Sequence, residues 1–290
     1  MADKVYLDND EATEAWNGVL FDRFTEFRDV VVRGLAAFGS DAMGHDPPHS
    51  GDHVIDLGCG FGDTTQALAQ IVGPDGSAVG VDVAERFIEQ SRLEADGSGV
   101  ENVSFEVTDV EREVPGGPYD YAFSRMGTMF FANPGAAMRN VHAALKPGGK
   151  LNMVVWRKKI ENEWFFRSEQ VVNRFVDEPD PDDSDEPTCG PGPFSMGNAD
   201  TASGILYGAG FVDIALRRID MPLLVGRDLD EAVAFGIALG PAAEVIRLAG
   251  DDADEMRPQI EADLRELASE YLSPAGVVTP ASCWAVTATA

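Results

Sequence analysis

The chain has 290 residues, of which 44% are hydrophobic and 25% charged, a composition typical of a folded globular protein rather than a disordered one. It carries 22 basic and 50 acidic side chains, a formal net charge of −28, and the basic residues form no stripe. Such a charge repels phosphate backbones and anionic lipid surfaces, so we expect no nucleic-acid partner and no membrane partner.

Cysteine use and hydropathy indicate the cellular compartment. The three cysteines, Cys59, Cys189 and Cys283, are odd in number and far apart, which disfavours a disulfide framework or a structural zinc site. Residues 1–16 are polar and acidic, unlike a signal peptide, and no apolar stretch is long enough to cross a bilayer. We therefore expect a reduced, cytoplasmic protein.

The first predicted element is helical and covers residues 10–38, where Trp16, Phe24 and other apolar residues recur at steps of three and four. The next stretch, 39–52, is rich in Gly, Pro and Asp and predicts a loop.

Two sets of potential metal ligands are present, but neither predicts a metal site. His45, His49 and His53 stand at every fourth position, yet Pro47-Pro48 between them prevents the helix that would align them. The acidic insert 177–187 lacks the spacing and the glycine of a calcium-binding loop, so it predicts a charged loop.

From residue 53 onward, short apolar runs alternate with helical segments. The predicted strands are 53–58, 77–81, 103–107, 119–124, 149–156, 211–219 and 281–289, and the predicted helices are 63–72, 84–95, 134–145 and 199–208. Strands that alternate with helices form parallel βαβ units, and continuously apolar strands belong to a sheet covered on both faces. The pattern predicts an α/β fold with a doubly wound, mostly parallel, seven-stranded sheet.

The run Val54-Ile55-Asp56-Leu57-Gly58-Cys59-Gly60-Phe61-Gly62 predicts a strand, a glycine loop and the start of a helix. Glycines allow a sharp turn and a close approach of a ligand to the main chain, and the following helix presents free N–H groups at its start. The spacing is GxGxG, which differs from the GxGxxG of dinucleotide-binding proteins.

Two carboxylates follow the loop at the ends of the next two strands. Asp82 lies 24 residues beyond Gly58, where a carboxylate can accept hydrogen bonds from both hydroxyls of a ribose. Asp109 follows the third strand, where it can accept a hydrogen bond from an adenine amino group.

Together these features resemble the class I S-adenosylmethionine-dependent methyltransferases, which implies a Rossmann-like fold and S-adenosylmethionine as the cofactor. The matching motifs, in order, are VIDLGCGFG (54–62), GVD (80–82), TDVE (108–111), YDYAFSR (119–125) and LKPGGKL (145–151). The last motif is a structural turn. Further segments, among them Trp16-Asn17-Gly18, 124–134 and 280–288, are similar to small-molecule methyltransferases of the ubiquinone and menaquinone biosynthesis type.

The resemblance implies an arrangement of the glycine loop around the methionine part of the cofactor. Gly58, Cys59, Gly60 and Gly62 would lie beside it, and Asp56 would help to hold its ammonium group. A tight turn without a ligand remains the alternative for the glycines, and a packing role the alternative for Cys59.

The resemblance implies further contacts at the ends of the next strands. Asp82 would hold the ribose, while the adenine would lie between Val83 on one side and Asp109 and Val110 on the other. A helix cap remains the alternative for Asp82, and a solvated turn the alternative for Asp109.

The fourth strand would end beside the methionine part. Ser124 and Arg125 lie there, and Arg125 would pair either with a carboxylate of a ligand or with a nearby Asp in a structural ion pair.

An aromatic wall would stabilise the cationic sulfonium through cation–π attraction. The candidate residues of the substrate pocket are Trp16, Met126, Phe130, Phe131 and Trp164. A plain core role is the alternative for each aromatic residue. Trp16 is the preferred lid residue, because an N-terminal helix often closes over the cofactor in this family. No catalytic residue is assigned, since no histidine or carboxylate is placed as a general base.

Two long detours, 157–198 and 225–275, are larger than a crossover between strands requires, and such insertions are usually lids or binding segments. The expected organisation is an N-terminal helical lid at 1–40, a cofactor-binding core at 41–156, an insertion or lid at 157–198, a core continuation at 199–224, a helical substrate cap at 225–275 and a last core strand at 276–290.

The predicted function is transfer of a methyl group by in-line displacement to the O, C or N atom of a small-molecule acceptor. One alternative is a nicotinamide-dependent oxidoreductase, which also uses a glycine loop and a ribose carboxylate. The other is a non-catalytic module that binds S-adenosylmethionine or a partner. A monomer and a homodimer both remain open.

Overall fold

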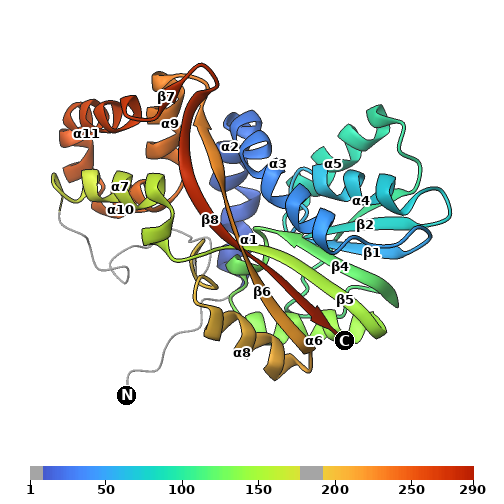
Figure 1. Ribbon diagram of the computed structural model, residues 1–290. Helices are drawn as coiled ribbons and strands as arrows, with labels where there is room; N and C mark the ends of the chain where they lie inside the picture. Colours follow the sequence, from blue (N-terminus) through green and yellow to red (C-terminus); the bar gives the residue numbers. More distant parts are fainter. Residues whose placement is uncertain (1–8, 177–191) are drawn as a thin grey trace.

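The computed structural model describes residues 9–176 and 192–290, and one twisted sheet runs through it with helices on both faces (Figure 1). The strands are β1 His53–Leu57, β2 Ser77–Asp82, β3 Val103–Val107, β4 Tyr119–Arg125, β5 Leu145–Trp156, β6 Val212–Gly226, β7 Leu272–Ser273 and β8 Gly276–Thr289. The α-helices are α1 Asn9–Asn17, α2 Val19–Glu26, α3 Arg28–His45, α4 Asp63–Val72, α5 Glu85–Ser98, α6 Pro134–Ala144, α7 Glu163–Val172, α8 Ala199–Ala209, α9 Leu229–Ala238, α10 Pro241–Ala249 and α11 Asp251–Ser269.

The strand order is β3-β2-β1-β4-β5-β8-β6, with β7 paired to β8 off this path. The first five strands pair in parallel, and β8 runs antiparallel to both of its neighbours. The predicted α/β, doubly wound and mostly parallel sheet is confirmed, and β7 is an additional strand of two residues. The order reverses between β1 and β4, and open α/β sheets bind their ligands at such a switch point, beyond the carboxyl ends of the strands.

Continuous apolar runs make the central strands, because both faces of the sheet are covered. In β1, Val54, Ile55 and Leu57 are fully buried. Helices α3, α4 and α5 lie on one face of the sheet and α6 and α8 on the other (Figure 1). Glycine and proline set the ends of several elements; for example, α4 begins after Gly62 and ends at Gly73, both in the left-handed region.

The N-terminal region is helical, as the sequence predicts, but it divides into α1, α2 and α3 with breaks at Gly18 and Phe27. The prediction of a loop over 39–52 is wrong for its first half, since α3 continues to His45. Tertiary packing explains the extension. Ala42 and Met43 are buried, and a Cβ at Gly39 would lie only 3.1 Å from Cδ of Arg125, so the glycine lets α3 approach β4 closely.

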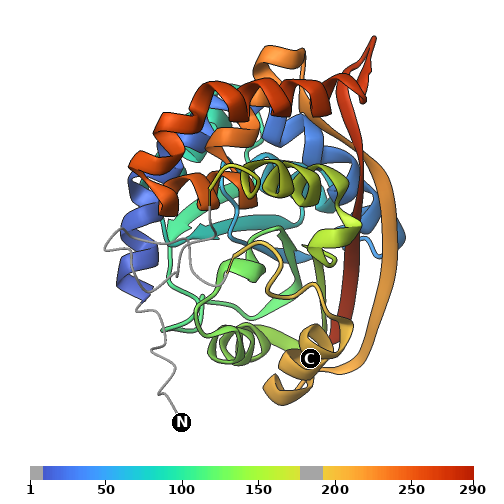
Figure 2. The same cartoon turned by 90° about the vertical axis from the view of Figure 1, so that its left-hand side faces the viewer.

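The second long detour is helical, as expected, and α9, α10 and α11 gather with α7 into a separate group of helices (Figure 2). We call these four helices the cap. Strands β6 and β8 are longer than predicted and extend beyond the sheet to the cap as a two-stranded ribbon. The buried side chains of Val225 and Val277 explain the extra length, because α9 packs against this end of the ribbon.

In the described ranges no single helix is long and apolar enough to cross a membrane, and only α9 and α10 pass that test together, as a pair bent by 60°. The acidic insert 177–187 and Cys189 lie outside the residues that the structure describes.

Candidate functional site

The loop between β1 and α4 turns at three glycines with left-handed backbone, Gly58 (φ 63°), Gly60 (φ 53°) and Gly62 (φ 76°). A Cβ at Gly62 would lie 2.6 Å from the ring of Phe105, and a Cβ at Gly58 would lie 3.0 Å from Cα of Gly127. A Cβ at Gly60 would meet no atom within 4 Å. Packing therefore requires glycine at 58 and 62, whereas the space beside Gly60 is open to a ligand.

Asp82 joins the end of β2 to this loop. Its Oδ2 accepts a hydrogen bond from the N–H of Gly60 at 3.1 Å, and its Oδ1 accepts one from the N–H of Ala84 at 3.0 Å. Burial raises the pKa of Asp82, and these backbone donors oppose the rise. A carboxylate has about four lone-pair positions, so Asp82 retains unused acceptor capacity.

Asp56 is fully buried beneath the loop. Its Oδ2 accepts hydrogen bonds from the hydroxyls of Thr64 at 2.6 Å and Thr65 at 2.7 Å, while its Oδ1 has no partner in the described structure. Burial raises the pKa of Asp56 to about 6, against the lowering effect of the two hydroxyls and of Arg125. The site thus contains a buried carboxylate with one oxygen left for a donor.

The end of β4 carries three predicted site residues in sequence. The Ser124 hydroxyl donates to the carbonyl of Leu57 at 2.8 Å, which ties β4 to β1. Arg125 donates two hydrogen bonds of 2.9 Å to Asp63, so its guanidinium forms the structural ion pair that was one of its two expected roles. Met126 adopts left-handed backbone (φ 59°), a strained conformation of the kind found at binding sites.

The residues expected around the adenine lie at the ends of β2 and β3. Asp109 accepts a hydrogen bond from the N–H of Glu111 at 2.9 Å and lies 3.2 Å from Nε of Arg112. Val110 is buried, and Val83 is half-buried directly after Asp82.

Cys59 lies in the glycine loop but points into a small apolar cluster with Ile88 and Phe105. Burial raises the pKa of its thiol well above the ordinary value, so the thiolate is disfavoured. This environment is that of a packing residue.

Aromatic side chains from α1 and α2 cover the carboxyl ends of the strands. The ring of Trp16 lies 5.0 Å from that of Phe130, and the ring of Phe21 lies 4.9 Å from that of Phe87. We call the three rings from these helices the aromatic lid, and it comprises Trp16, Phe21 and Phe24. Its contacts reach the glycine loop, the start of α5 and the segment after β4, through Phe61, Phe87 and Phe130.

Arg86 fastens the aromatic lid to the first turn of α5. Its guanidinium donates to the carbonyl of Asn17 at 3.1 Å and to Asp22 at 2.7 Å, and it stacks over Phe21 at 4.1 Å from the ring centre. Its backbone N–H also donates to the side chain of Asn17 at 3.3 Å. The sequence analysis missed Arg86, because nothing in its spacing connects it with residues 17–22.

Residues 48–176 match a family model described as a methyltransferase domain. This range contains the glycine loop, Asp82, Asp109 and the end of β4. The chain contains a class I S-adenosylmethionine-dependent methyltransferase domain. The predicted family and its cofactor, S-adenosylmethionine, are thereby confirmed.

Curated relatives of this methyltransferase domain carry names of several kinds. The chain is 33% identical over 135 residues to an aklanonic acid methyltransferase of Streptomyces sp. (strain C5), covering 45% of this chain and 60% of that protein. It is 30% identical over 107 residues to a nocamycin O-methyltransferase of Saccharothrix syringae, covering 37% and 38%. It is 31% identical over 115 residues to a ubiquinone/menaquinone biosynthesis C-methyltransferase of Pseudomonas aeruginosa, covering 39% and 45%. The matches thus span less than two thirds of each relative.

Solved structures share the fold of this protein over nearly the whole chain. A cyclopropane-fatty-acyl-phospholipid synthase-like protein from Lactobacillus casei has a TM-score of 0.57 at 15% identity, covering 89% of this chain and 91% of that one. A protein from Bacillus halodurans described as a putative methyltransferase has a TM-score of 0.52 at 16% identity, covering 87% and 98%.

The predicted pocket residues fall into two places. Trp16 and Phe130 are in contact, Met126 is buried at the end of β4, and Phe131 is half-buried beyond a short turn. Trp164 instead lies on α7 in the cap, where its indole is 1% exposed and packs against α9 at Gly236. The structure therefore does not bring Trp164 into the aromatic lid.

Across residues 9–176 and 192–290, no group of three or more His, Cys, Asp or Glu side chains is arranged to hold a metal ion. His142 packs edge-on against Phe211, with ring centres 5.0 Å apart, on the α6 and α8 face of the sheet.

Proposed function

We propose that this chain transfers the methyl group of S-adenosylmethionine to a small-molecule acceptor. The single observation that carries the proposal is the open space beside Gly60, bordered by Asp82 with unused acceptor capacity. When bound, the cofactor supplies a methyl group on a sulfonium that is already a good leaving group. The protein then has to align the acceptor with the methyl group and exclude water.

The residues around the open space fit the polar groups of the cofactor. Asp82 accepts the two ribose hydroxyls with the lone pairs that Gly60 and Ala84 leave free. Asp56 meets the ammonium group, directly or through water, with the oxygen that lacks a partner. The backbone beside Gly60 borders the methionine part.

The edges of β2 and β3 supply the adenine site in this proposal. Val83 and Val110 offer apolar surface, and Asp109 accepts from the adenine amino group. Ser124 and Arg125 act indirectly, since both are engaged with other protein groups and hold the end of β4 in place.

Exclusion of water is assigned to the aromatic lid. Trp16, Phe21 and Phe24 cover the strand ends with apolar surface, and aromatic faces also attract the cationic sulfonium. Arg86 keeps the lid in place through Asn17 and Asp22.

A small molecule is the proposed acceptor for two reasons. The net charge of −28 repels nucleic acids. Two of the curated relatives carry the names of small molecules, aklanonic acid and nocamycin.

The test is a calorimetric titration of the purified protein with S-adenosylhomocysteine, with NADH as the control ligand. We expect micromolar binding of the first, at a free energy of about −8 kcal/mol, and no heat from the second. Binding of NADH alone would support the oxidoreductase alternative. Binding of neither ligand would remove the cofactor site from the proposal.

A further inference from the structure

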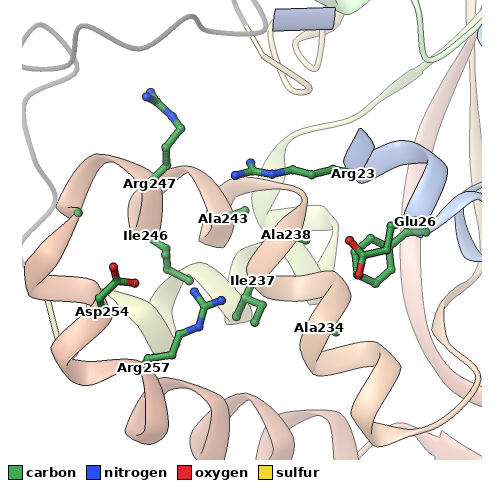
Figure 3. A pocket seen from close by; sticks show the side chains of 12 residues that line it. Arg23, Glu26, Ala234, Ile237, Ala238, Ala243, Ile246, Arg247, Asp254 and Arg257 are labelled. Carbon is green, nitrogen blue, oxygen red and sulfur yellow. The ribbon is translucent and has the colours of Figure 1, made fainter. Parts of the chain in front are cut away.

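A cavity lies outside the residues assigned to the cofactor. It has a volume of about 480 Å³ and opens between α2 and the cap helices α9, α10 and α11 (Figure 3). None of its lining residues belongs to the glycine loop or to the ends of β2, β3 and β4. Pockets for small organic ligands commonly measure about 300–1,000 Å³, so the cavity is large enough for one.

Part of the lining of this cavity is apolar. Its apolar lining comes from Phe27 at the end of α2 and from both arms of the α9–α10 bend, namely Ala234, Ile237, Ala238, Ala243 and Ile246. The alanines leave room where larger side chains would fill the space. This part of the lining offers contacts to an apolar ligand body.

Charged side chains also line the cavity. Arg23 reaches from α2 across towards the cap, and Arg257 points from α11 into the same space, while Arg247 turns outward (Figure 3). Two acidic residues, Glu26 and Asp254, also line the cavity.

The three arginines differ in how they are engaged. Arg247 is paired with Glu244 at 2.9 Å and Arg257 with Glu261 at 3.1 Å. Arg23 is half-buried and, within the part of the chain that the structure describes, its guanidinium makes no hydrogen bond or ion pair, although its backbone carbonyl accepts a hydrogen bond from Phe27. A partly buried guanidinium without a counterion is costly unless a ligand supplies the anion.

We propose that this cavity binds a small organic anion with an apolar body and a carboxylate, whose carboxylate is held by Arg23 and Arg257. The planar fork of a guanidinium matches a carboxylate with two parallel hydrogen bonds, and the pairing strengthens where water is partly excluded. The apolar body rests on the α9–α10 bend. The proposal concerns a binding site that is separate from the cofactor residues.

The test is a fluorescence titration with anthracene-2-carboxylate, and with its uncharged methyl ester as the control ligand. We expect the wild-type protein to bind the carboxylate at least about tenfold more tightly than the ester. In Arg23→Gln the affinity for the carboxylate falls at least about tenfold, while the affinity for the ester stays within about twofold. Arg257→Gln gives a smaller loss in the same direction, because Glu261 already shares this guanidinium.

The matched control is Arg33→Gln, which removes the same charge from an exposed ion pair with Asp29 on α3, away from the cavity. It should bind the carboxylate as the wild type does. Equal affinity of the wild type for acid and ester, an absence of probe binding, or an Arg23→Gln variant that retains full affinity would each overturn the proposal. S-adenosylhomocysteine is titrated into the same samples, so failure of the anion site and failure of the cofactor site are distinguished.

Discussion

The open space beside Gly60 can be tested with one added methyl group. In Gly60→Ala the new Cβ meets no protein atom within 4 Å, so the folded chain accommodates it. The remaining cost is the left-handed backbone (φ 53°), about 1 kcal/mol for a residue with a Cβ. For a chain of this size such a loss lowers Tm by about 2–4 °C.

The same methyl group occupies the space that the proposal assigns to the cofactor. Overpacking of this kind costs about 1–3 kcal/mol, and a middle value of about 2 kcal/mol corresponds to a roughly thirtyfold loss of affinity. The assay is calorimetric titration with S-adenosylhomocysteine, combined with a thermal melt of the same sample. We expect the Kd for S-adenosylhomocysteine to increase about thirtyfold, together with a small decrease in Tm.

Gly99→Ala is the matched control for backbone strain. Gly99 ends α5 with φ 76°, and a Cβ there also meets no atom within 4 Å, but it lies far from the glycine loop. It should lose similar stability and keep its affinity. If Gly60→Ala binds S-adenosylhomocysteine within about twofold of the wild type, no ligand passes beside Gly60 and the reasoning fails.

Three further substitutions test the surrounding residues. Asp82→Ala removes the two proposed hydrogen bonds between the ribose and a charged acceptor, which together contribute about 3 kcal/mol, so S-adenosylhomocysteine should bind about a hundredfold more weakly. The control, Asp75→Ala at an exposed position, should bind it normally. Equal affinity of the two variants would contradict the ribose assignment. Arg86→Gln releases the aromatic lid, so hydrogen exchange in α1 and α2 should increase while exchange in the sheet stays constant; unchanged exchange in both helices would refute the role of Arg86. The pKa of Asp56 rises from 3.8 to about 6 on folding, so the folded state binds the proton more tightly than the unfolded state does. Above pH 6 the ionised Asp56 therefore lowers the free energy of unfolding by about 3 kcal/mol, and below pH 4 this destabilisation disappears. Asp56→Asn should therefore raise the melting temperature relative to wild type at pH 7.5 and lose most of this advantage at pH 4.5, and a difference that does not depend on pH would rule out the raised pKa.

The methyltransferase core could be predicted from the sequence because its signals are local. Gly62, Gly73-Pro74 and the apolar run 54–57 set the ends of β1 and α4 without help from distant residues. The glycine loop, Asp82 and Asp109 stand at the ends of strands, and parallel strands bring their carboxyl ends to one edge of the sheet.

The features that the sequence could not supply depend on contacts between distant segments. Helix α3 runs on to His45 because Gly39 fits against Arg125, 86 positions away along the chain. The role of Arg86 follows from its contacts with Asn17 and Asp22, which lie more than 60 positions earlier in the chain and which no local pattern around Arg86 predicts. The placement of Trp164 follows from the packing of α7 on the rest of the cap, which no local pattern records.

Helix α2 takes part in both of the proposed sites. Phe21 and Phe24 belong to the aromatic lid, while Arg23 and Glu26 on the same helix line the cavity at the cap. The helix has eight residues, none of them buried, and breaks at Gly18 and Phe27 separate it from its neighbours. Its position therefore depends on contacts at the two sites rather than on a core of its own.

Two ligands that both contact such a helix are thermodynamically linked. If the anion changes the affinity for the cofactor by some factor, the cofactor changes the affinity for the anion by the same factor. An anion at the cap that steadies α2 would slow the departure of spent cofactor, and its own release would free the helix to open.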